Sequence, residues 1–192
     1  MKKIKKILRI FKKLFMIILI GPSASGKTEI AKKLISTFGY KKFVTTTTRN
    51  KRVGEIDGVD YYFISVDEFK ENLTNNKFIE TTIYNNNYYG SYKSEMGDNK
   101  VLIVEPNGLK AFQSLNDPHI ISFFIDSSED DRYERMLKRG DEINDIKRRL
   151  DNDRKLFYEN FKTDFRIINK NKTLEELSID INNLYLKKIK SL

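Results

Sequence analysis

The sequence predicts an α/β fold in which a parallel sheet is flanked by helices. Three short apolar runs have the character of strands buried on both faces, and helical patterns alternate with them. These runs are residues 16–20 (MIILI), 100–104 (KVLIV) and 120–125 (IISFFI). Strands that alternate with helices in this way form a layered structure around a parallel sheet.

The first apolar run leads into a loop that is framed by glycines. Residues 21–28 read GPSASGKT and match GxxxxGK[ST], a phosphate-binding loop (P-loop) whose backbone N–H groups and lysine hold phosphates while its hydroxyl holds magnesium. Apolar residues then recur at helical spacing up to Gly39, and the start of that helix directs a partial positive charge at the same anion. Strand, loop and helix in this order indicate a sheet of the P-loop NTPase type.

The segment 45–92 interrupts the alternation of strands and helices. It contains β-prone stretches around a turn at Asp57-Gly58, a helical pattern from Ser65 to Leu73, and aromatic strand-like stretches around an asparagine turn at 85–87. This composition indicates an inserted, mixed β-rich subdomain that binds a substrate. The core would then comprise residues 16–44 and 93–192.

Two capping patterns locate helices in the last third of the chain. Ser128 with Asp131 opens a helix that carries several arginines, and Thr173 with Glu176 opens the final helix. Between them we expect a further helix from about Glu142 and a short strand at 164–168.

Charge is concentrated at the start of the chain. Residues 1–15 hold seven of the 36 basic residues and no acid, which leaves 29 basic and 27 acidic residues in the body. A body that is nearly neutral does not support a nucleic-acid-binding surface. The extension could form a basic amphipathic helix that contacts anionic lipid. The alternatives are an upstream start codon, a disordered tail or a signal peptide. Cleavage of a signal peptide here would cut through the P-loop.

The remaining composition limits the compartment and the chemistry. The chain has no cysteine, which excludes a disulfide framework and fits a reducing, cytoplasmic location. The longest apolar run, 14–20, is far shorter than the roughly 20 residues of a membrane span.

Several segments together resemble the guanylate kinases, nucleoside monophosphate kinases that transfer a phosphoryl group from ATP to GMP. The resemblance covers about residues 16–189. It rests on GPSASGKT, TTTTRNKRVGEIDGVDYYFIS, KFIE, NYYGS, RYERMLKRG and IKRRL, which occur in the family's order and at close to its spacing. It implies ATP-dependent phosphorylation of GMP and dGMP in purine nucleotide metabolism, with Mg²⁺ as cofactor and ATP and GMP as partners. It also implies a lid at about 138–150 that closes over ATP.

The resemblance assigns the acceptor site to the inserted subdomain. Two guanidinium groups and two phenols would hold the GMP phosphate, and a carboxylate with two hydroxyls would contact guanine. The expected GMP-binding residues are Thr45, Arg49, Arg52, Tyr61, Glu80, Tyr89, Ser91 and Glu105.

The resemblance also assigns the donor site. Lys27 would hold the β- and γ-phosphates, Thr28 would bind the metal, and arginines of the lid would neutralise charge during transfer. The expected ATP-binding residues are Gly21, Pro22, Ser23, Ala24, Ser25, Gly26, Lys27 and Thr28, and the expected catalytic residues are Lys27, Arg52, Arg135, Arg139 and Arg149.

The sequence departs from the family pattern at one acidic position. Where the family has two acids around one apolar residue, this chain has Ile103-Val104-Glu105, so the first acid is missing. The predicted lid is also about one residue shorter than the lid of the guanylate kinases that the chain resembles. For Arg132 and Arg148 we expect solvated helix faces.

Two other functions fit the same fold. One is a catalytically weak, guanylate-kinase-like module that binds a phosphorylated or acidic partner; the other is a kinase that acts on a phosphosugar. An intact Lys27 and Thr28 favour catalysis, and Glu80 with Thr45 and Ser91 favours guanine as the acceptor base.

Overall fold

The structure is a computed structural model that describes residues 15–84, 86–157 and 162–192. The predicted basic extension therefore lies, apart from Phe15, outside the described residues. Within the described ranges, no helix is both long and apolar enough to cross a membrane.

The central sheet of the described chain has five parallel strands in the order β2-β7-β1-β8-β9. This arrangement confirms the predicted parallel sheet. The strands are β1 (Met16–Ile20), β2 (Lys41–Lys42), β7 (Lys100–Ile103), β8 (Ile120–Asp126) and β9 (Phe165–Ile168).

Strand β1 lies at the centre of the sheet and is wholly buried. Ile17 and Leu19 join one apolar cluster, whereas Ile18 joins another on the opposite face. Because successive side chains of a strand point to opposite faces, a strand covered on both sides must be apolar at every position. This explains why MIILI contains no polar residue.

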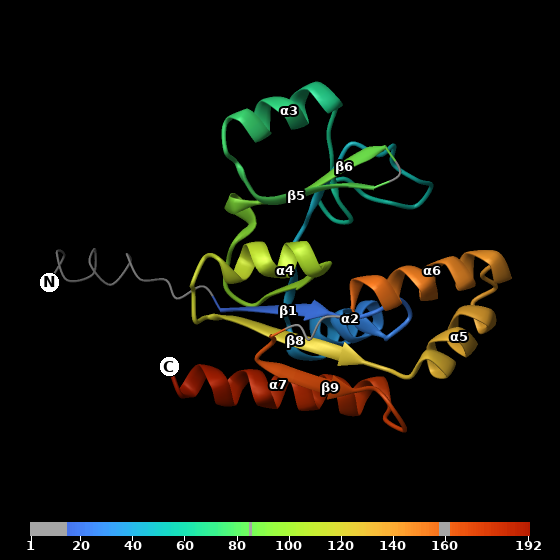
Figure 1. Cartoon of the computed structure of the whole chain (residues 1–192). Helices are drawn as coiled ribbons and strands as arrows, with labels where there is room; N and C mark the ends of the chain where they lie inside the picture. The colour runs from blue at the N-terminus through green and yellow to red at the C-terminus, as the bar shows by residue number, and fades with distance from the viewer. Residues whose placement is uncertain (1–14, 85, 158–161) are drawn as a thin grey trace, which may run out of the picture.

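Helices cover both faces of the sheet (Figure 1). Helices α2 (Lys27–Phe38) and α7 (Leu174–Lys190) share one cluster, and α4 (Pro106–Gln113) packs in the other. Helices α5 (Glu129–Lys138) and α6 (Ile143–Leu156) lie beyond the end of the sheet toward which β1 and β8 point.

The predicted capping patterns are present. The Ser128 hydroxyl accepts the Asp131 N–H at the start of α5, and Thr173 and Glu176 form a complete capping box at the start of α7. Gly39 ends α2 with a φ of 73°, a left-handed conformation that suits glycine.

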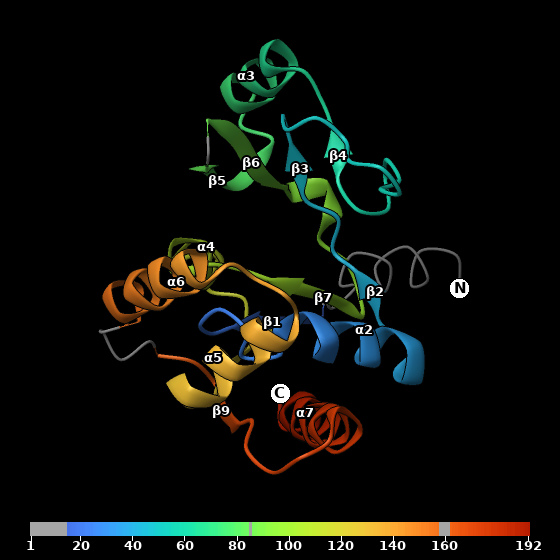
Figure 2. The ribbon, with the colours of Figure 1, turned by 90° about the vertical axis from the view of Figure 1, so that its right-hand side faces the viewer.

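A second, mixed sheet stands apart from the central sheet in both ribbon views (Figure 1 and Figure 2). Its strand order is β4-β3-β6-β5, with β3 parallel to β4 and the other pairs antiparallel. The elements are β3 (Thr46–Thr47), β4 (Tyr62–Phe63), α3 (Val66–Thr74), β5 (Phe78–Tyr84), β6 (Asn87–Tyr92) and the 3₁₀ turn η1 (Lys93–Glu95). The prediction of a β-rich insertion is confirmed.

Aromatic stacking holds the second sheet together. The Phe78 ring stacks on Phe69 and on Tyr92, with a centroid separation of 4.6 Å in each case. A Cβ on Gly90 would lie 2.8 Å from the Phe78 ring, so this position requires glycine. Aromatic pairs of this kind replace the large apolar core that so small a sheet lacks.

One carboxylate joins the two segments of chain that connect the sheets. Glu95 accepts the Val44 N–H at 3.2 Å, the Tyr62 hydroxyl at 2.7 Å and the Lys100 ammonium at 2.8 Å. The Tyr62 hydroxyl thus ties strand β4 of the second sheet to this junction.

Candidate active site

The P-loop occupies the turn between β1 and α2, and its glycines are required by close contacts. A Cβ on Gly21 would lie 2.3 Å from the Ile125 carbonyl oxygen, and one on Gly26 would lie 2.7 Å from the Asn169 side-chain nitrogen. Gly26 also has a φ of 103°, which other residues rarely adopt. The GxxxxG spacing thus matches two points where the loop backbone touches its neighbours.

Lys27 folds back over the loop. Its ammonium donates to the carbonyl oxygens of Gly21 at 2.6 Å and Pro22 at 2.8 Å. Burial lowers the pKa of Lys27, while the nearby carboxylates of Glu105 and Asp153 oppose that shift. The loop therefore presents a cation that few waters solvate, which strengthens its attraction for a phosphate. Thr28 is exposed at the first turn of α2.

Arg135 connects α5 to the P-loop. Its guanidinium donates to the Ala24 carbonyl at 3.1 Å, to the Ser127 hydroxyl at 3.0 Å and to the Asn169 carbonyl at 3.3 Å. Arg135 is thus already directed at the loop that it was predicted to serve.

Arg139 and Arg149 lie farther along the predicted lid. Both are exposed and both pair with Asp141, Arg139 through two hydrogen bonds and Arg149 at 3.9 Å. The Asp141 carboxylate raises the pKa of Arg139, and the arginines lower the pKa of Asp141. The structure therefore gathers these two arginines around one acid, whereas Arg135 contacts the loop.

The second sheet gathers most of the residues predicted for the GMP phosphate. Arg49 pairs with Glu55 at 2.7 Å and lies 5.6 Å from the centre of the Tyr61 ring, and the Tyr61 and Tyr89 rings are 6.2 Å apart. Burial is the main reason that the pKa of Tyr61 is raised. Arg52 is exposed in the adjoining loop, where its backbone N–H donates to the Glu55 carboxylate at 2.8 Å.

Glu80 and Ser91 face each other across the β5–β6 ladder. The Ser91 hydroxyl donates to Glu80 Oε1 at 2.6 Å, and a Cβ on Gly108 would lie 3.8 Å from the Glu80 carboxyl carbon. The Glu80 carboxylate therefore faces α4 of the core. Desolvation raises the pKa of Glu80 above its ordinary value, and the Ser91 hydrogen bond partly offsets this effect. Thr45 is half-buried before β3, and its carbonyl accepts the Tyr62 N–H.

Glu105 precedes α4 at the carboxyl end of β7. Desolvation raises the pKa of Glu105, and the nearby Lys27 ammonium lowers it. Ile103, at the position of the missing acid, is half-buried and packs on the core cluster of β1 and α2. The site thus has a carboxylate only at the second of the two family positions.

The expectation of a solvated helix face for Arg132 is wrong. Its side chain is only 7% exposed and pairs with the equally buried Asp153 at 2.7 Å. Arg148 does lie on an exposed face, where it pairs with Asp145 at 2.8 Å. Sequence reasoning also missed Asp153 and Asn169, which bond to the P-loop from 130 and 144 residues away.

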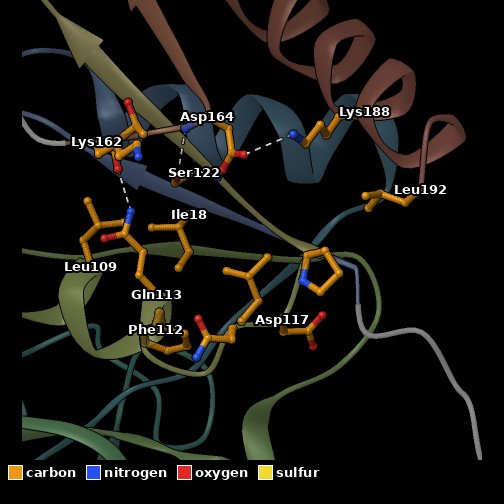
Figure 3. A pocket seen from close by; sticks show the side chains of 14 residues that line it. Ile18, Leu109, Phe112, Gln113, Asp117, Ser122, Lys162, Asp164, Lys188 and Leu192 are labelled. Atoms are coloured by element: carbon orange, nitrogen blue, oxygen red, sulfur yellow. Dashed lines mark hydrogen bonds and ion pairs between the residues drawn. The ribbon is translucent and has the colours of Figure 1, made fainter.

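A cavity of about 450 Å³ lies away from the P-loop and from the predicted GMP-binding residues (Figure 3). It is lined by residues of β1 and α4, by residues near the starts of β8 and β9, and by the end of α7, among them Ser122, Asp164 and Lys188. None of the residues predicted for the active site lines it, and the P-loop lies at the opposite, carboxyl end of the parallel strands. The ligand site is therefore assigned from the P-loop and the second sheet.

Comparison with known proteins identifies the relatives of the chain. The family model described as guanylate kinase matches residues 13–187. Guanylate kinase of Mycoplasma genitalium is 36% identical over 174 residues, which cover 83% of this chain and 72% of the relative. Guanylate kinase of Mycoplasmoides gallisepticum is 35% identical over 186 residues, which cover 90% and 92%.

A solved structure agrees in fold. The crystal structure of guanylate kinase from Anaplasma phagocytophilum superimposes with a TM-score of 0.65 at 22% identity, covering 92% of this chain and 87% of that one. The P-loop fold and these relatives make the chain a nucleoside monophosphate kinase. Since the family model spans most of the sequence, the chain belongs to the guanylate kinase family.

Proposed function

We propose that the protein transfers the γ-phosphoryl group of ATP to GMP, and to dGMP, as a step of purine nucleotide metabolism. The observation that carries this proposal is the paired Glu80 and Ser91, which face the core from the second sheet while the P-loop lies on the core itself. Such a division gives the acceptor and the donor separate binding surfaces.

Glu80 would select guanine by its charge. Guanine presents N1–H and an exocyclic amino group side by side, and one carboxylate can accept both hydrogen bonds. Adenine has an acceptor at N1, which a carboxylate repels. Thr45 and Ser91 would complete the base site.

The acceptor phosphate would lie near the Arg49–Tyr61–Tyr89 group. Guanidinium groups bind phosphate through two parallel hydrogen bonds, and phenol hydroxyls can donate further ones. Arg52, on the exposed loop, would add a second guanidinium and contact the transferred group. Glu55 pairs with Arg49 and thereby orients it.

On the donor side, Gly21 to Thr28 would hold the ATP phosphates, with Lys27 as the fixed cation. Phosphoryl transfer depends on alignment and on positive charge around the transferred group, and an arginine can contribute about 10³- to 10⁵-fold in rate. Arg139 and Arg149 would supply that charge from the predicted lid at about 138–150, and Arg135 would supply it from α5 beside the lid. A GMP phosphate oxygen is already ionised, so no general base is required.

The residues present fit a magnesium ion bound together with ATP. Magnesium commonly keeps several waters and takes one or two protein oxygens plus phosphate oxygens. Thr28 offers a hydroxyl at the P-loop, and Glu105 offers a carboxylate near Lys27. The ion would neutralise phosphate charge, while Lys27 and the arginines hold the phosphates in line.

A coupled assay of ADP release tests the proposal against its alternatives. We expect activity with GMP and dGMP, and little with AMP, UMP or phosphosugars. Activity only with a phosphosugar would support the changed acceptor. Binding of GMP without turnover for any acceptor would support the binding module.

We also propose a cytoplasmic location and a weak contact of residues 1–15 with anionic lipid. Seven basic residues and apolar residues at helical spacing support the lipid contact. Co-sedimentation with phosphatidylserine vesicles should fall when residues 1–14 are removed. Equal sedimentation of both chains would refute it.

A further inference from the structure

A buried ion pair joins α5 and α6, the two helices that overlap the ends of the predicted lid. Arg132 of α5 and Asp153 of α6 are each 7% exposed, and their closest atoms, Nη1 and Oδ2, are 2.7 Å apart. Taking two charges out of water is costly unless further hydrogen bonds satisfy them. The remaining partners of this pair therefore indicate what it does.

The carboxylate of Asp153 is bonded to the P-loop. Its Oδ2 accepts the backbone N–H of Ser23 at 2.9 Å, and its Oδ1 accepts the Ser23 hydroxyl at 3.2 Å. Arg132 Nη1 lies 3.5 Å from the Ser23 carbonyl oxygen. The pair thus contacts both the backbone N–H and the carbonyl oxygen of Ser23, the third residue of the loop.

The next residue of the loop needs such support. Ala24 has a φ of 57°, a left-handed conformation that residues other than glycine rarely adopt unless neighbouring contacts stabilise it. Its methyl group packs on the small cluster of Met136 and Ile146, and its carbonyl accepts from Arg135. The α5 and α6 helices therefore hold the tip of the P-loop in an unfavourable backbone conformation.

We propose that Arg132 and Asp153 are positioning residues for the donor site: Asp153 holds the Ser23 amide and hydroxyl so that the P-loop keeps its phosphate-binding shape, and Arg132 neutralises and orients Asp153. Neither residue touches the transferred phosphoryl group. Because Arg132 belongs to α5 and Asp153 to α6, the pair also links the position of these two helices to the shape of the P-loop.

The inference rests on the proposed use of ATP, and its test separates effects on the donor, ATP, from effects on the acceptor, GMP. We expect Asp153→Ala to raise the KM for ATP about 10-fold, as loss of a hydrogen bond to a charged group would, while the KM for GMP stays constant. Asp153→Asn keeps one acceptor for the Ser23 N–H and should recover part of the loss. The matched control is Asp145→Ala, which breaks an exposed pair with Arg148 on the same helix and should leave both KM values unchanged.

A second variant keeps the test decisive if Asp153→Ala folds poorly because Arg132 is left unpaired. Arg132→Leu with Asp153→Ala removes both buried charges, so the fold should persist while the Ser23 anchor is still lost. We expect the raised KM for ATP to remain. A normal KM for ATP in the folded double variant would overturn the proposal, as would an equal rise in the KM for GMP.

A calorimetric measurement of ATP binding in the absence of GMP tests this inference separately from the proposed function. If the wild-type protein failed to phosphorylate GMP, the proposed acceptor would be wrong. A weaker affinity of the variants for ATP would then still support the positioning role, and an unchanged affinity would refute it.

Discussion

Replacement of Glu80 by glutamine should test the choice of base with little effect on the fold. The Ser91 hydroxyl donates to Glu80 Oε1 at 2.6 Å. In the variant the amide oxygen should take this place when the Ser91 hydroxyl remains the donor, as it is toward Glu80, because the amide nitrogen cannot accept a hydrogen bond. The amide nitrogen would then point at guanine, where it faces the N1–H and amino donors.

The size of the effect follows from the hydrogen bonds that are lost. A hydrogen bond to a charged group is worth about 1.5–3 kcal/mol, so loss of one should lower kcat/KM for GMP by about 10- to 150-fold. AMP, whose N1 has no hydrogen to donate, should lose much less. The melting temperature should change little, because the Glu80 carboxylate is only half-buried and the Ser91 contact can be kept.

The assay is ADP release with GMP and AMP for four proteins: the wild type, Glu80→Gln, Ser91→Ala and the double variant. Without the Ser91 hydroxyl the glutamine amide is free to flip, so the penalty of Glu80→Gln should be smaller in the Ser91→Ala background. Equal losses for GMP and AMP, or no loss for GMP, would place Glu80 outside the base site. A penalty that does not depend on Ser91 would refute the orientation argument.

Three further changes test other parts of the site. Lys27→Ala should abolish phosphoryl transfer but leave the affinity for GMP, measured by calorimetry without ATP, unchanged, since the hydrogen bonds of Lys27 within the described part of the chain go to Gly21 and Pro22 of the P-loop. A parallel loss of GMP affinity would show that the two sites are not separate. Ile103→Asp should raise activity at limiting magnesium, because it restores the missing acid, but it should lower the melting temperature, because Ile103 packs on the core. Unchanged magnesium dependence in a folded variant would mean that Glu105 and the phosphates suffice to bind magnesium. Desolvation raises the pKa of Glu80, and guanine requires the ionised carboxylate, so kcat/KM for GMP should fall as the pH drops, beginning above the usual pKa of a glutamate. Glu80→Gln should lack this acidic fall in the pH profile. If the fall remained in Glu80→Gln, it would belong to another group.

Much of the fold could be predicted because its signals are local. A short apolar run such as MIILI is typical of a strand that is buried on both faces, and the capping pairs at Ser128 and Thr173 involve residues three positions apart. The P-loop pattern specifies glycines at points of close backbone contact. These constraints act over a few residues, so they are visible without a structure.

The error at Arg132 has a physical cause. Arg132 and Met136 are one helical turn apart and share the buried face of α5, but a charged residue in a helix is normally solvated. Burial becomes favourable only through Asp153, which lies on another helix 21 residues later. No local sequence pattern predicts such a distant partner. Asn169 could not be predicted for the same reason, because it follows β9 and donates to the Ser25 carbonyl from far along the chain.

The donor site follows from the parallel direction of the central strands. β1, β7, β8 and β9 end at one edge of the sheet, and each is followed within two residues by a group that forms or approaches the P-loop: Gly21, Glu105, Ser127 and Asn169. Ligands of open α/β sheets bind at this edge. The loop is therefore held by the core on one side and by Arg135 of α5 and Asp153 of α6 on the other. In contrast, Glu80 lies on a strand of the separate second sheet, and Arg49 lies in the loop after its strand β3. It follows that substitutions around the P-loop should change the KM for ATP without changing the KM for GMP, and that substitutions on the second sheet should do the reverse.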